Sequence, residues 1–128
     1  MRILVAFDDD YRAYADALSK AIGAARSHLN VTLAGLEALQ TQVARLDPHL
    51  VVSSLPNPAA EQEDDEEEGN LLLAWVELSV DPHLPSQFCV ASRRWESLNP
   101  SLEELLDVVD ETELLVLSSS SSRRSEAC

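Results

Sequence analysis

Three consecutive aspartates, Asp8, Asp9 and Asp10, directly follow the short apolar run of residues 3–7. A later apolar run ends at Ser54. Loop carboxylates at the end of a buried strand are ligands that a hard cation such as Mg²⁺ prefers. A serine hydroxyl needs a neighbouring base to act as a nucleophile, and none is evident beside Ser54. The aspartates therefore indicate at most a weak Mg²⁺ site. The alternative, which we favour, is that they end a strand and cap a helix.

The elements that position these residues follow from hydrophobic periodicity. Short apolar runs alternate with helical spacings, which predicts a strand, a helix, a strand, a helix and a strand at residues 2–7, 11–25, 31–34, 36–46 and 50–54. This order predicts a parallel sheet with right-handed crossovers. We expect Asp10 to cap the first helix. Asp47-Pro48 should end the second, because proline disfavours helical conformation in the preceding residue.

The second half of the chain departs from this alternation. Residues 71–80 and 87–92 read as strands, and the six residues between them include two prolines. A parallel crossover needs about a dozen residues or more, so these strands should form an antiparallel hairpin. A last helix is expected to start with Asn99 as its cap and Pro100 in its first position. Residues 112–117 are either an extra strand or an extension of that helix.

The chain of 128 residues has the length of one domain. We assign residues 1–117 to a single α/β domain and residues 118–128 to a flexible serine-rich tail. Residues 59–69 contain a dense acidic run, which predicts a disordered loop because like charges resist compaction.

The acidic trio and the segment ending at Ser54, with Pro58 following, resemble the response-regulator receiver (CheY-like) family. The resemblance implies a flavodoxin-like three-layer α/β sandwich, here with an antiparallel hairpin replacing the fourth helix. In that family the position of Ser54 is an aspartate that accepts a phosphoryl group, and a lysine follows the fifth strand. Lys20 is the only lysine of this chain and falls in the first predicted helix. The resemblance therefore implies a degenerate pseudo-receiver that lacks both groups.

This combination predicts a non-catalytic signalling or protein-interaction domain that aspartyl phosphorylation does not switch. It predicts no enzyme activity and no cofactor beyond weak Mg²⁺. The alternative is a metal-dependent phosphoryl-handling enzyme or phospho-receiver that uses Asp8, Asp10 and Ser54. A third possibility is a structural module whose acidic residues 61–68 bind a basic partner.

The net charge of −14 argues against binding to nucleic acid or to an anionic membrane. No secretory signal or membrane-spanning run is evident, and two cysteines are too few for a disulfide framework, so we expect a cytoplasmic protein. Interface hot spots favour tryptophan and arginine, which makes Trp95, Arg93 and Arg94 candidate partner contacts. The alternative for Trp95 is packing under the last helix. A protein partner or a homodimer is predicted to use the exposed hairpin edge, at residues 71–92, and the last helix.

Overall fold

The computed structural model describes residues 1–54, 73–79, 81, 83–91 and 93–118. These residues form one six-stranded sheet and three α-helices. In chain order the elements are β1 (Arg2–Phe7), α1 (Arg12–Ala25), β2 (Asn30–Gly35), α2 (Leu39–Leu46), β3 (Leu50–Ser53), β4 (Ala74–Glu77), β5 (Ser86–Val90), β6 (Arg93–Ser97) and α3 (Leu102–Ser118). Short 3₁₀ turns, Asp9–Tyr11 and Leu36–Ala38, lead into α1 and α2.

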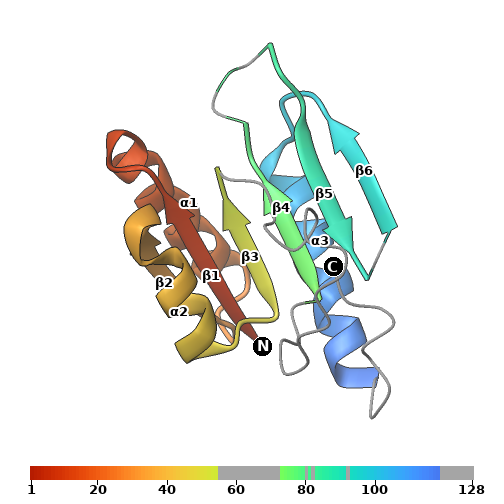
Figure 1. Cartoon of the computed structure of the whole chain (residues 1–128). Coiled ribbons are helices and arrows are strands. Elements are labelled where there is room, and N and C mark those ends of the chain that lie inside the picture. Colours follow the sequence, from red (N-terminus) through yellow and green to blue (C-terminus); the bar gives the residue numbers. More distant parts are fainter. Residues whose placement is uncertain (55–72, 80, 82, 92, 119–128) are drawn as a thin grey trace, which may run out of the picture.

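The strands lie in the order β2-β1-β3-β4-β5-β6 (Figure 1). β1 pairs in parallel with β2 and β3, and β3 pairs in parallel with β4. β5 is antiparallel to both β4 and β6. The sheet is therefore mixed, and the predicted α/β class is confirmed. The parallel half follows the predicted β-α-β-α-β order.

Helices cover both faces of this sheet (Figure 1). On one face, α1 and α3 pack on alternate residues of the strands and form the larger core, which includes Ile3, Val5, Ile22, Leu50, Val52, Val76, Phe88, Leu105, Val108 and Val109. On the other face, α2 covers a smaller core of Leu4, Ala6, Leu39, Val51 and Trp75. The strands β1 and β3 are almost continuously apolar because both of their faces are buried.

Strand β6 was not predicted from the sequence, and it changes which strand forms the edge of the sheet. Because β5 pairs with β6, the predicted exposed edge at residues 71–92 is wrong, and within the described residues β6 is the edge strand on this side of the sheet. Arg93, Arg94 and Glu96 are exposed on this edge. Charged side chains of this kind discourage pairing with a further strand. Ala91, between β5 and β6, has a φ of 52°, which suits a tight reversal of the chain.

The two predicted helix caps differ from those in the structure. Asp10 lies in the 3₁₀ turn, and α1 begins at Arg12 without a side-chain cap. For α3, the Glu104 amide donates to the Ser101 hydroxyl oxygen at 3.1 Å. Ser101, rather than Asn99, is therefore the cap of α3. Asn99 was expected as the cap because Pro100 follows it, but α3 begins two residues later, at Leu102.

The ends of the other helices agree better with the sequence. α2 ends at Leu46, and Asp47 adopts a left-handed conformation with a φ of 50°. Residues 112–117 continue α3, which settles the choice between a strand and a helix extension. The helix also includes Ser118, which the sequence assigned to the tail.

Some of the predicted features lie outside the described residues. They are the acidic loop at 59–69 and residues 119–128 of the tail. Cys89 in β5 is buried and is disulfide-bonded, which the sequence did not predict, and the second cysteine of the chain also lies outside the described residues. Across the part of the chain that the structure describes, no helix combines the length and apolar character needed to cross a membrane.

Candidate functional site

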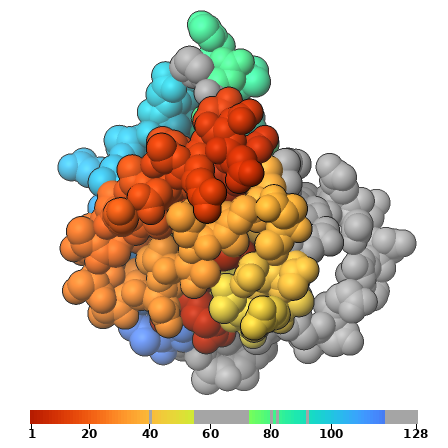
Figure 2. Space-filling model, turned by 90° about the vertical axis from the view of Figure 1, so that its left-hand side faces the viewer, coloured from red at the N-terminus to blue at the C-terminus, as the bar shows by residue number. Residues whose placement is uncertain are grey.

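The carboxyl ends of the parallel strands bring the predicted chemical residues to one edge of the sheet. β1 and β3 are adjacent and parallel, so Asp8 and Ser54 follow neighbouring strand ends. The chain leaves β1 toward β2 on one side and returns to β3 on the other. In open α/β sheets this reversal of strand order is a common ligand position. In the view from the β2 side, the red segment around the end of β1 lies in the upper part of the molecule, below the green residues (Figure 2).

The three aspartates are exposed and do not converge. Asp9 and Asp10 lie in the 3₁₀ turn, and the backbone carbonyl of Asp8 accepts a 2.9 Å hydrogen bond from the Tyr11 amide. Within the described residues, no three histidine, cysteine, aspartate or glutamate side chains are grouped so that they could hold a metal ion. The three aspartates therefore belong to a tight connection between β1 and α1.

Ser54, the position of the family's phospho-acceptor, is half-buried just beyond β3. Ser53 is fully buried, and it lies level with Glu77 of β4 in the parallel register. Glu77 is half-buried, and this burial raises the pKa of its carboxyl. Sequence reasoning did not single out Glu77. The available signal was an acidic residue inside the most apolar strand of the chain.

Two of the basic side chains are already paired. Lys20 of α1 forms an ion pair with Asp16 at 3.1 Å. Arg93 of β6 forms an ion pair with Glu111 of α3. Neither side chain is therefore placed as the phosphate-neutralising cation that a receiver uses.

The predicted partner contacts separate onto two faces of the sheet. Trp95 is half-buried against the larger core and stacks on Phe88 with ring centroids 5.2 Å apart. The Arg93 guanidinium lies 4.7 Å from the Trp95 ring centroid. Trp95 therefore packs on the sheet face that α3 covers. Arg94 is exposed and pairs in register with Cys89, so it lies on the opposite face.

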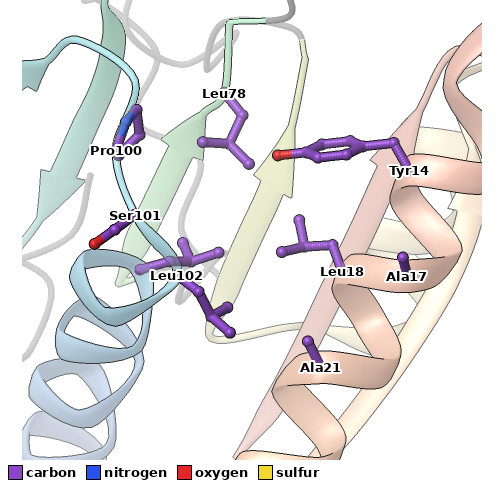
Figure 3. A pocket seen from close by; sticks show the side chains of 9 residues that line it. Tyr14, Ala17, Leu18, Ala21, Leu78, Pro100, Ser101 and Leu102 are labelled. Carbon is purple, nitrogen blue, oxygen red and sulfur yellow. The ribbon is translucent and has the colours of Figure 1, made fainter.

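A groove lies between α1 and α3 (Figure 3). It has a volume of about 320 Å³. Its lining is almost wholly apolar and consists of Tyr14, Ala17, Leu18, Ala21, Leu78, Pro100, Ser101, Leu102 and Leu105. The volume and the lining are typical of a small binding site, for which volumes of about 300–1,000 Å³ are usual.

The walls of the groove differ in character. Tyr14 of α1 points toward Leu78, and Leu102 of α3 lies across from Leu18 (Figure 3). Tyr14 and Leu102 remain 49% and 43% exposed. Alanines Ala17 and Ala21 form the α1 wall, and their small size leaves the space open. Burial raises the pKa of the Tyr14 hydroxyl. The Tyr14 ring also meets Phe7 edge-to-face, with 5.5 Å between the ring centroids.

Two side-chain contacts, one of them an ion pair, join α3 to the residues that follow the end of α1, away from this mouth. Arg26, which caps the end of α1, donates to both carboxylate oxygens of Asp110 at 2.7 and 2.8 Å. The His28 Nε2 lies 2.7 Å from a Glu113 carboxylate oxygen. The hydrogen bond from Arg26 lowers the pKa of the Asp110 carboxyl. The helices are thus tied at one end and separated by the groove at the other.

Sequence reasoning missed this groove because its residues come from distant parts of the chain. The local signals were the alanine-rich sequence of α1 and the leucine that follows Pro100-Ser101. No protein-family model, curated protein or solved structure matches the chain.

Proposed function

We propose that this protein is a non-catalytic protein-interaction domain built on a receiver-like frame, and that aspartyl phosphorylation does not switch it. The observation that carries the proposal is the apolar groove between α1 and α3. Half-exposed Tyr14 and Leu102 at its mouth give a partner apolar surface to bury.

The receiver-like part of the proposal rests on the strand order and on the acidic trio. The order β2-β1-β3-β4 with parallel pairing is the arrangement that the resemblance implies for this part of the sheet. Asp8 and Ser54 stand where that family places its reactive edge. In this interpretation, the antiparallel strands β5 and β6 replace the last strand-helix-strand crossover of a receiver.

Isothermal titration with Mg²⁺, with and without beryllofluoride as a phosphoryl mimic, tests the proposal. We expect no saturable heat and no change in tryptophan fluorescence, because the three aspartates are exposed and spread along a turn. The matched variants are Asp10→Ala and Asp47→Ala. Asp47 precedes β3 and so lies at the opposite end of the parallel strands. Saturable binding that is lost in Asp10→Ala and kept in Asp47→Ala would establish the metal-dependent phosphoryl alternative instead.

A further inference from the structure

Cys89 is a buried residue among exposed neighbours on the sheet face opposite α3. It pairs in register with Trp75 of β4 and with Arg94 of β6, so these three side chains lie on the same face. Arg94 is exposed, and so are Gln87 and Glu96, the next pair along this face. Cys89 is nevertheless only 6% exposed, although it belongs to neither of the two described cores. Its burial is therefore not explained by either core.

The covalent partner of Cys89 follows by elimination. Cys89 is disulfide-bonded, and the chain contains one other cysteine, Cys128. Within one chain the disulfide can therefore join Cys89 only to Cys128. A disulfide holds the Cα atoms of its two residues about 4.4–6.8 Å apart. A residue held this close to Cys89 accounts for one buried position on an otherwise exposed part of the sheet.

The described elements bring the end of α3 to the edge of the sheet nearest Cys89. β5 ends at the amino edge of the parallel strands, since its last residue, Val90, is level with Ala74, the first residue of β4. α3 reaches the same edge, because Glu113 contacts His28, which lies just before β2. Figure 1 shows α3 continuing past the end of β5.

The segment that follows α3 is long enough to reach Cys89. Cys128 is ten residues beyond Ser118, the last residue of α3. Ten residues span at most about 33–36 Å. On its way from the α3 face to β5, this segment has to pass one strand, β6, and neighbouring strands lie about 5 Å apart. The disulfide therefore needs no rearrangement of the described elements.

We propose that the disulfide between Cys89 and Cys128 is a redox-sensitive tether, which holds residues 119–128 on the β5–β6 face and releases them on reduction. A dithiol reductant supplies two electrons and two protons. The sulfur–sulfur bond breaks into two thiols, and the reductant becomes a disulfide. Exposed Gln87 and Arg94 leave the surroundings of Cys89 open to such a reductant. The inference does not depend on the proposed interaction function.

Peptide mapping identifies the partner of Cys89 directly. The full chain is equilibrated with oxidised glutathione, its free thiols are alkylated, and it is digested with trypsin without reductant. Because trypsin cleaves after arginine, residues 46–93 should appear cross-linked to residues 125–128. Reduction before alkylation should separate the two peptides and leave both cysteines alkylated.

Thermal unfolding measures what the tether does to the fold. The disulfide closes a loop that contains β6 and α3, and such a loop restricts the unfolded chain. Reduction should therefore lower the Tm by roughly 5–15 °C. Cys128→Ser should show the lowered Tm with or without reductant. Ser125→Ala, the matched control in the same segment, should respond to the reductant as the parent chain does.

Tryptophan fluorescence measures release of the segment. The chain has two tryptophans, so Trp95→Phe leaves Trp75, which is level with Cys89, as the only emitter. Reduction should raise its emission, because a disulfide quenches an indole beside it. Cys128→Ser in the same background should give the reduced spectrum under both conditions.

Three outcomes would overturn the inference. They are free thiols or glutathione adducts at both cysteines after oxidation, a reducible dimer that links Cys89 of two copies, and an oxidised chain whose Tm and Trp75 emission do not respond to reduction. None of them alters the Mg²⁺ titration, so the proposed function is tested separately.

Discussion

At the scale of single residues, the carboxylates at the carboxyl edge of the described sheet differ in their burial. Asp8, Asp9 and Asp10 are exposed, whereas Glu77 is half-buried beside the buried Ser53. Burial disfavours the charged form of a carboxyl group, which is why the pKa of Glu77 is raised. The carboxylate whose charged form is disfavoured therefore lies in β4, one strand away from Ser54, the position that the sequence indicated.

Replacement of Glu77 by glutamine should stabilise the protein at neutral pH. A carboxyl whose folded pKa is raised contributes stability below its unfolded pKa and loses that contribution as the pH rises through the folded pKa. The advantage of Glu77→Gln should therefore grow between pH 4 and pH 7. Because Glu77 is partly exposed, we expect a gain of at most about 1 kcal/mol. Urea unfolding at both pH values measures this difference.

The exposed Glu96 of β6 provides the control for this measurement. Glu96→Gln makes the same chemical change on the same sheet without removing a buried carboxylate. If both variants change the unfolding free energy equally at pH 7, general charge reduction is responsible and the burial of Glu77 is not.

At the scale of elements, contacts between distant segments produced the features that the local sequence did not predict. The first half was predictable because β1 and β3 are short apolar runs and because proline stops α2. The segment Arg93–Ser97 has alternating exposure and three charged residues, and it became β6 only through its register with β5. The groove could not be predicted at all, since α1 and α3 are distant in the sequence.

The position of the α3 cap gives an element-scale prediction. Ser101→Ala removes the hydroxyl that accepts a hydrogen bond from the Glu104 amide. We expect a loss of about 0.5–2 kcal/mol in unfolding free energy. Ser101→Thr keeps a hydroxyl and should lose much less. Chemical denaturation of the three proteins checks this. Equal losses in the alanine and threonine variants would contradict the assignment of Ser101 as the cap.

At the scale of the whole molecule, stability depends on a core shared by both halves of the sheet. The larger core joins strands β1 and β3 of the parallel half to β4, β5 and α3 of the other half. Exposed leucines at the end of α3, such as Leu114 at 66%, contribute little to this core. The apolar contacts are therefore concentrated at the centre of the sheet, while the charge lies on its periphery.

Leu50→Ala tests this distribution. Leu50 is fully buried at the centre of the sheet, and truncation of a buried leucine costs about 2–5 kcal/mol. Leu114→Ala makes the same chemical change at an exposed site and should stay within about 0.5 kcal/mol of the parent chain. Thermal or urea unfolding compares the two. A small loss for Leu50→Ala would mean that the core is less tightly packed than its burial indicates.

The groove has one wall from each half of the chain, and this has a consequence for folding. β4, β5, β6 and α3 are joined by short connections, so their contacts need little loop closure, whereas the pairing of Ile3 with Leu50 closes a long one. We expect the C-terminal half to gain structure early and the two groove walls to meet late. A groove ligand would then bind only the fully folded chain and, by mass action, would raise its free energy of unfolding.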